Sequence, residues 1–400
     1  MLVDPVANPF NPGAGTPPPE LAGRDELLET ARVSLERLRR GRPSKSMLLV
    51  GLRGVGKTVL LDRIRELAEG LGVETIRIEA PENRSLPAML APQLRLALLR
   101  LSRQTKAKDL AVHALRALAG FARSLKMKFG DIEVGIDYEP EPGLADNGDL
   151  DQDLMALLQA AGEAAKAAES ALVLFIDELQ YVDEGELASL TMALHRCAQR
   201  SLPIALFGAG LPQLPGQMGR AKSYAERLFD FPTIDALGHD AAVAAVRKPI
   251  QAESTTIADG AVEEIVRVTH GYPYFLQQWG KHTWDIARQS PIERADVEAA
   301  SPLAVAALDE SFFRVRFDRL TPSERRYLRA MAELGPGPHR SGDIADVLAR
   351  NVSTLAPLRA TLIGKGMVWS PNHGDTGFTV PLFDEFMRRM MPGDDWRSAA

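Results

Sequence analysis

One short segment of the sequence has the residue types and spacing to hold phosphate. Residues 51–58 read GLRGVGKT and match the pattern G-x-x-x-x-G-K-[ST], directly after an apolar run and directly before a helical pattern. Glycines let successive backbone N–H groups turn toward phosphate oxygens, and the helix adds the positive end of its dipole. A glycine-rich turn that merely precedes a helix is the alternative. We expect Lys57 to reach the β/γ-phosphates and Thr58 to ligate Mg²⁺, in a cradle made of Gly51, Arg53, Gly54, Val55, Gly56, Lys57 and Thr58.

Two adjacent carboxylates follow a second apolar run, ALVLFI at 171–176. Ligands bind at the carboxyl edge of open α/β sheets, where Asp177 and Glu178 would lie. We expect Asp177 to hold the metal or its water and Glu178 to polarise the attacking water. A strand that simply ends in solvent would look the same. Because this one follows the phosphate loop with strand–helix units between them, the sequence predicts a site for ATP and Mg²⁺.

The elements that must position these groups alternate between strand and helix patterns. Short apolar runs predict strands, and residues spaced at i, i+4 and i+7 predict the helices between them. This order predicts a parallel sheet sandwiched by helices, which is an α/β fold. An alternating pattern around Gly130-Asp131 predicts a hairpin insertion near 125–138. The expected strands lie at 47–50, 73–80, 171–177 and 203–207, and the expected helices include 25–40, 86–102 and 108–124.

The rest of the chain divides by composition and pattern. The first residues are rich in proline and glycine and predict a flexible tail. After the sheet region only helical patterns follow, and then three short helices precede strands at 367–370 and 377–380. Helices followed by a hairpin suggest a winged helix–turn–helix. The expected parts are a tail at 1–20, a nucleotide-binding core at 21–234, a helical lid at 235–316 and a winged helix at 317–392.

Together the segments GLRGVGKT, LVLFIDE and the upstream LAGRDEL resemble AAA+ ATPases, in the initiator (origin-recognition) or STAND-like subgroup. The resemblance covers about residues 20–390. It implies a nucleotide-dependent switch that hydrolyses ATP to ADP and phosphate. It also implies that Leu21 to Arg24, including Gly23 and Arg24, lie against the adenine, although an ordinary helix cap would look alike. Arg227 is similar in position to the family's arginine finger, offered to a neighbouring subunit of a homo-oligomer, with Arg220 as second choice and a surface ion pair as the alternative.

Two departures from the family pattern concern the rate of hydrolysis. The segment 207–210, FGAG, has no polar side chain where the family carries a sensor residue after its fourth strand. The segment 271–274, GYPY, lacks the arginine expected in the lid. Both departures favour a slow switch over a fast motor.

The carboxy-terminal part reverses the sign of the charge. Residues 314–390 hold 11 Arg and 1 Lys against 8 Asp and Glu, a net charge of +4 in a chain of net charge −6. Such a local reversal suits contact with the phosphates of duplex DNA. Protein docking by a STAND-like scaffold with little turnover is the alternative. The candidate contacts are Ser353, Thr354 and Arg359 on the recognition helix, Arg340 and Lys365 at the backbone, and His373 at the wing tip.

Several classes of protein are excluded by composition. The only cysteine, Cys197, cannot form an internal disulfide, which points to a reducing compartment. No apolar run approaches the ~20 residues of a membrane span, and the first residues do not resemble a signal peptide. We therefore expect a cytoplasmic protein with no membrane partner.

Overall fold

The computed structural model describes residues 2–13, 15–80, 84–129 and 138–397. The chain divides into two compact units. We call Arg24–Gly51 with Lys57–Ile234 the core unit, and Met1–Gly23 with Leu52–Gly56 and Asp235–Ala400 the C-terminal unit.

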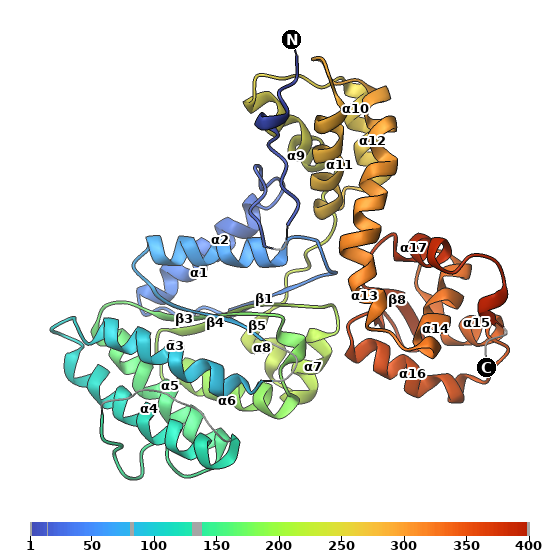
Figure 1. Cartoon of the computed structure of the whole chain (residues 1–400). Coiled ribbons are helices and arrows are strands. Elements are labelled where there is room, and N and C mark those ends of the chain that lie inside the picture. The colour runs from blue at the N-terminus through green and yellow to red at the C-terminus, as the bar shows by residue number, and fades with distance from the viewer. Residues whose placement is uncertain (1, 14, 81–83, 130–137, 398–400) are drawn as a thin grey trace. The chain divides into compact units, whose positions relative to one another are not determined.

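The core unit contains a five-stranded sheet with strand order β2-β3-β4-β1-β5, and its pairings are all parallel. Parallel neighbours need crossover connections, and here helices supply them (Figure 1). The strands expected from the apolar runs are confirmed, and the short β5 is an addition. They are β1 (Ser46–Val50), β2 (Glu74–Glu79), β3 (Leu172–Asp177), β4 (Ile204–Gly210) and β5 (Phe229–Asp230).

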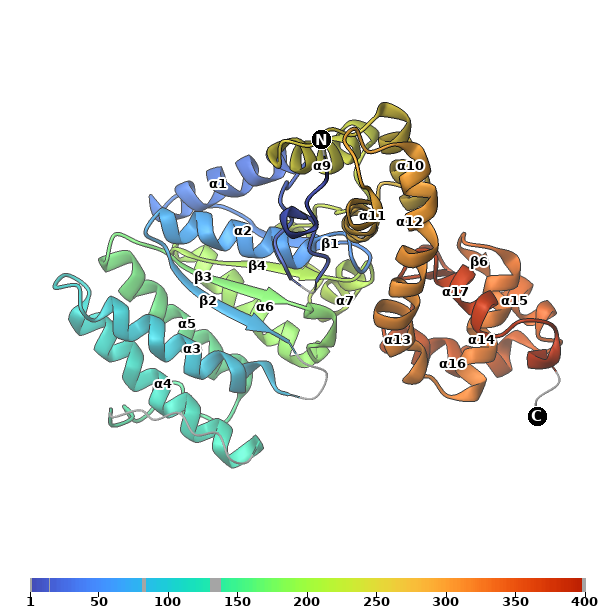
Figure 2. The ribbon, with the colours of Figure 1, turned by 45° about the horizontal axis from the view of Figure 1, so that its top comes forward.

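Helices cover both faces of this sheet, so β1, β3 and β4 are buried throughout. Figures 1 and 2 show α1 (Asp25–Arg39) and α2 (Lys57–Gly70) on one face. The other face carries α3 (Leu86–Leu101), α5 (Leu150–Ala167) and α6 (Glu184–Gln199), with α4 (Lys108–Phe129) packed outside on α5. Two short helices, α7 (Leu214–Ala221) and α8 (Ala225–Leu228), follow β4.

The prediction of a hairpin near 125–138 is wrong for its first strand, because residues 125–129 are helical. Helix α4 continues to Phe129, because no glycine or proline interrupts the chain between Gly120 and Gly130. Residues 130–137 lie outside the described residues. Gly120, inside α4, is required by packing, because a Cβ there would lie 2.6 Å from the carbonyl oxygen of Leu144.

Residues 235–318 of the C-terminal unit are mostly helical, as the sequence predicts. The helices are α9 (His239–Ala252), α10 (Asp259–Thr269), α11 (Pro273–Ile286) and α12 (Arg294–Ala307), continued by a π-helical stretch, Leu308–Phe313, and α13 (Arg314–Asp318). The sequence motif Thr321-Pro-Ser-Glu324 forms a complete capping box at the start of α14 (Pro322–Leu334).

The expected helix pair and hairpin then follow. Helices α15 (Ser341–Val347) and α16 (Val352–Gly364) precede β7 (Val368–Trp369) and β8 (Asp375–Phe378). The short strand β6 (His339–Arg340) pairs with β8, which completes a three-stranded antiparallel sheet of order β6-β8-β7. Helix α17 (Phe383–Met390) comes last and packs on α14.

The first residues are not the flexible tail that their composition predicts. Phe10 is 3% exposed, and its ring lies where a Cβ on Gly280 would approach within 2.7 Å. The Asn8 side chain donates to the carbonyl of Lys281 at 3.1 Å, and Val3 N–H donates to the carbonyl of Arg288 at 3.2 Å. Val3 and Phe10 are buried, Phe10 against Gly280 of α11, and the free energy of this burial opposes the entropy cost of ordering the segment.

Within the described ranges, no helix is both long and apolar enough to cross a membrane.

Candidate nucleotide site

The phosphate loop connects β1 to α2, as the sequence predicts. Gly54 and Gly56 adopt the left-handed backbone conformation, with φ of +84° and +89°. Only glycine takes this conformation without steric cost. A Cβ on Gly56 would meet no atom within 4 Å, so open space borders the loop at this point. The loop leads into the N-terminus of α2, which favours an anionic ligand.

Lys57 is held at the base of this loop. Lys57 is buried, at 8% exposure, and its ammonium group donates to the carbonyl of Gly51 at 2.9 Å. A buried cation costs free energy unless it is compensated. The phosphate groups of a nucleotide are ligands that would compensate it.

Thr58 and Asp177 come together from the start of α2 and the end of β3. The Thr58 hydroxyl donates to the Asp177 carboxylate, which also accepts the N–H of Glu178 at 2.8 Å. Asp177 is 3% exposed, and this burial raises its pKa, although the bonds from Thr58 and Glu178 act in the opposite direction. A hydroxyl and a carboxylate side by side are the hard oxygen ligands that Mg²⁺ prefers, so these two residues fit that ion.

Glu178 lies at the turn after β3, in the left-handed conformation with φ of 54°. Such a conformation is unfavourable for a residue with a side chain and is maintained by its surroundings. The neighbouring Gln180, which the sequence did not point to, donates to the Glu178 carboxylate through its amide nitrogen.

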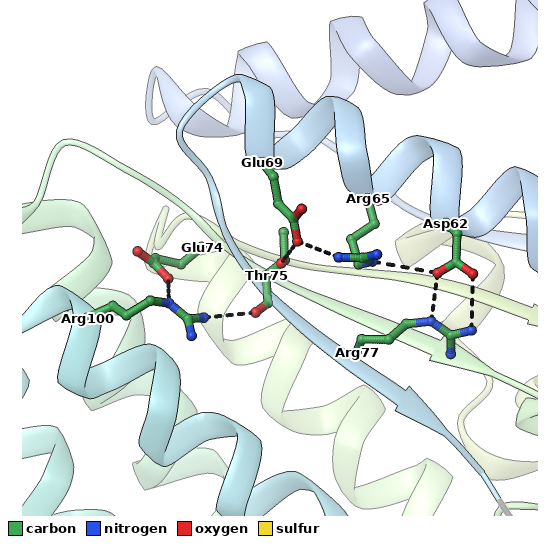
Figure 3. Close-up of polar contacts among 7 residues, drawn as sticks. All are labelled: Asp62, Arg65, Glu69, Glu74, Thr75, Arg77 and Arg100. Carbon is green, nitrogen blue, oxygen red and sulfur yellow. Dashed lines mark hydrogen bonds and ion pairs between the residues drawn. The ribbon is translucent and has the colours of Figure 1, made fainter.

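A second residue that the sequence analysis did not single out, Arg77 on β2, links α2 to the end of β3. Its Nε donates to Asp62 on α2 at 2.8 Å, and its guanidinium lies 3.9 Å from the Asp177 carboxylate. Figure 3 shows that Asp62 also faces Arg65, at 3.6 Å. The same polar row continues from Arg65 to Glu69 and Thr75, while Arg100 of α3 bonds Glu74 at 2.7 Å. The sequence signal available for Arg77 was its charge, because it lies within a predicted strand of a sheet that helices were expected to cover on both faces.

The tip of the loop, Leu52–Gly56, belongs to the C-terminal unit and contacts other residues of that unit. Arg53 N–H donates to the carbonyl of Thr379 at 3.1 Å, and the Tyr272 hydroxyl donates to the carbonyl of Arg53. A Cβ on Gly54 would lie 3.0 Å from the Tyr272 ring, so this position has no room for a side chain. Val55 is buried, at 1% exposure.

The residues assigned only by resemblance are placed as follows. Gly23 has a φ of +68°, and a Cβ on it would lie 2.7 Å from the side chain of Ala241, while Arg24 is the half-buried N-cap of α1. Arg227 of α8 is exposed and makes no ion pair or side-chain hydrogen bond among the described residues. Arg220 pairs with Glu184 at 3.4 Å.

The cations expected to contact DNA are mostly bonded within their own domain. Arg359 donates to Thr376 at 2.6 Å and to Ser370 at 2.7 Å, and Lys365 pairs with Glu324 at 2.8 Å. Ser353, Thr354, His373 and Arg340 are exposed.

Comparison with family models agrees with this geometry. A model described as "AAA ATPase domain" matches residues 20–207, and one described as "Domain of unknown function (DUF8462)" matches residues 310–387. No curated protein matches the sequence.

Solved structures are similar over most of the chain. The Walker-type ATPase PABY2304 of Pyrococcus abyssi is 16% identical with a TM-score of 0.60, over 93% of this chain and 98% of that one. The RuvB Holliday junction branch migration motor of Thermotoga maritima is 17% identical with a TM-score of 0.43, over 89% and 92%. The Orc1 protein of Aeropyrum pernix, solved in complex with DNA, is 15% identical with a TM-score of 0.45, over 94% of each chain. The first of these confirms the α/β P-loop fold.

Proposed function

We propose that the chain is an AAA+ P-loop ATPase, because its residues 20–207 match the AAA ATPase domain family. In this proposal it is a nucleotide-dependent switch that hydrolyses ATP slowly to ADP and phosphate. The observation that carries the proposal is the contact between Thr58, at the end of the phosphate loop, and the buried Asp177 at the end of β3. It brings a hydroxyl and a carboxylate to the edge of the sheet where a triphosphate on the loop would end.

Each residue then has a role. Lys57 neutralises the β- and γ-phosphates, and Thr58 and Asp177 would hold Mg²⁺. The bound metal supplies a Lewis acid for the phosphate oxygens. Glu178 orients the attacking water in line with the γ-phosphate and accepts its proton. Gly51 and Gly56 let the loop backbone come close to the phosphates, and Arg53, Gly54 and Val55 complete the loop. Gly23 and Arg24 would lie against the adenine of the nucleotide.

Two substitutions separate binding from turnover. Lys57→Ala should lose nucleotide binding, because the loop loses its buried cation. Glu178→Gln should bind ATP as the wild type does and slow hydrolysis about 10²-fold or more. A fluorescent ATP analogue measures binding, and phosphate release measures turnover. Lys108→Ala and Glu66→Gln, which change exposed residues, are the matched controls. Wild-type turnover by Glu178→Gln would refute the assigned role of Glu178.

We also propose that Arg227 acts on the nucleotide of a neighbouring copy. Its exposure and its lack of a bonding partner among the described residues leave the guanidinium available. If the finger is supplied between subunits, Arg227→Ala and Glu178→Gln should each hydrolyse ATP slowly alone and regain activity when the two variants are mixed. Arg220→Ala, whose arginine is paired with Glu184, is the control. If mixing restores nothing and Arg227→Ala turns over normally, no such finger exists.

For the C-terminal domain, the contacts favour the scaffold-type alternative, a protein partner, over duplex DNA. Arg340 and Arg350 are exposed and have no side-chain partner among the described residues, so they are candidate contacts for a phosphate backbone. The exposed positions of α16 are uncharged: Val352, Ser353, Thr354, Ala356, Pro357, Ala360, Thr361 and Gly364.

Fluorescence anisotropy with a labelled duplex, across a range of salt, tests this preference. We expect only weak binding at physiological salt, unchanged by Ser353→Asp on α16. Tight binding that weakens by about 0.9 log units per log salt for each phosphate, and that Arg340→Ala with Arg350→Ala reduces, would establish DNA as the partner instead.

A further inference from the structure

The side chain of Gln180 joins the turn after β3 to the end of β4. Its amide nitrogen donates to the Glu178 carboxylate, and its amide oxygen accepts the N–H of Leu211 at 3.1 Å. Leu211 is the first residue after β4. Gln180 is 9% exposed, so both hydrogen bonds form away from bulk water.

The two glycines of β4 make room for this arrangement. A Cβ on Gly210 would lie 3.2 Å from the Gln180 amide oxygen, and a Cβ on Gly208 would lie 2.3 Å from the side chain of Leu179. Residues 207–210 have no polar side chain of their own, and Gln180, from the turn after the neighbouring strand β3, places its amide group beside them.

The orientation of the amide follows from its partners. A carboxylate can only accept a hydrogen bond and a backbone N–H can only donate one, so nitrogen must face Glu178 and oxygen must face Leu211. Glutamine can donate to Glu178 and accept from Leu211 at the same time, and it carries no charge. Glutamate would place a second carboxylate beside the first, and leucine would leave the buried N–H unpaired.

We propose that Gln180 is a positioning residue for hydrolysis, which fixes the Glu178 carboxylate relative to the end of β4. This rests on the proposed ATPase function and adds a residue to it. The left-handed backbone of Glu178 must be maintained by its surroundings, and the hydrogen bond from Gln180 is one contact that fixes the direction of its carboxylate. A misplaced base cannot orient the water, whereas the phosphate loop that binds the nucleotide does not use this bond.

Three variants test the proposal in the full-length protein. Gln180→Leu removes both hydrogen bonds. Gln180→Glu keeps an acceptor for Leu211 but removes the donor to Glu178. We expect both to lower kcat about 10–100-fold with KM and ATP affinity within twofold. Gln213→Leu changes the half-buried N-cap of α7, whose side chain makes no hydrogen bond among the described residues, and it should leave kcat unchanged. Melting temperatures within a few degrees of wild type would exclude general unfolding.

A double-mutant cycle shows whether Gln180 acts through Glu178. In single-turnover measurements, Gln180→Leu should add nothing to the loss already caused by Glu178→Gln, because the carboxylate it positions is gone. Additive losses would overturn the proposal, as would wild-type kcat in Gln180→Leu and Gln180→Glu while Glu178→Gln is slow. If instead Glu178→Gln itself turned over normally, the failure would lie in the assigned ATPase mechanism.

Discussion

Asp177, the Mg²⁺ ligand of our proposal, is buried at a cost to stability. Its carboxylate is buried, and burial raises its pKa, which means that the charged form is disfavoured in the folded chain without a cation beside it. The Thr58 hydroxyl and the Arg77 guanidinium offset part of that cost. The charge is retained, in our account, because Mg²⁺ needs it.

Asp177→Asn should therefore separate stability from function. Without nucleotide or metal, the variant should melt at or above the wild-type temperature, by about 2 °C, since a buried charge is removed. ATP binding should lose most of its dependence on Mg²⁺. Thermal unfolding and a metal titration of nucleotide affinity measure the two effects. A large fall in melting temperature would show that the charge stabilises the empty site.

At this scale the sequence pointed to Lys57, Thr58, Asp177 and Glu178 as candidate site residues, because their neighbours in the chain define their setting. Arg77 and Gln180 could not be identified in the same way. Their partners, Asp62 and Leu211, are brought to them by the parallel pairing of strands and by the turn after β3, which no local pattern encodes.

At the scale of elements, the strands and most helices follow from apolar spacing, and the exception is informative. The alternating residues at 125–129 fit a strand, yet α4 continues through them because nothing ends the helix. Continuation of an existing helix costs less than nucleation of a new element, so a pattern beside a long helix is weak evidence for a strand.

Gly120 of α4 tests the packing of that helix. Alanine is usually better than glycine in a helix by about 1 kcal/mol, but here its Cβ would press on the backbone of Leu144 at 2.6 Å. Gly120→Ala should lower the melting temperature. Gly70→Ala, at the end of α2 with open space around its Cβ, should raise it slightly. Equal effects of the two substitutions would mean that the Leu144 loop moves aside without cost.

The start of α14 gives a pH dependence. Glu324 is 2% exposed, and although burial raises its pKa, hydrogen bonds from Lys365 and Thr321 lower it below the ordinary 4.5. Its contribution to stability is therefore present above pH 4.5 and is lost as the pH falls through the lowered value. Lys365→Met should lower the free energy of unfolding by about 1–2 kcal/mol at pH 7, a modest loss because Lys365 is partly exposed. The loss should be much smaller at low pH, where Glu324 is protonated. Chemical denaturation at pH 7 and at a series of lower pH values checks this, and a loss that stays equal across the whole series would contradict it.

At the scale of the whole molecule, the sequence predicted the alternation of strands and helices and the C-terminal helices with their hairpin. It did not predict that residues 2–13 pack on the C-terminal unit. Composition favoured a flexible tail, whereas Val3 and Phe10 are buried, Gly280 leaves space for the Phe10 ring, and Asn8 and Val3 add hydrogen bonds to the C-terminal unit.

Phe10→Ala should measure that packing. Loss of a buried phenyl ring costs about 3–5 kcal/mol in a well-packed site. We expect earlier unfolding of the C-terminal unit and faster proteolysis within residues 2–13, while nucleotide affinity stays at the wild-type level. Val6→Ala, at an exposed position, is the control. Equal protease resistance of Phe10→Ala and wild type would show that the segment is held by other contacts.

Calorimetric titration of the purified full-length protein with ATP and Mg²⁺ tests the central claim most directly. We predict saturable binding of one nucleotide per chain, weakened when Mg²⁺ is chelated and abolished by Lys57→Ala. A folded wild-type protein that takes up no ATP at millimolar concentration with metal present would contradict the account.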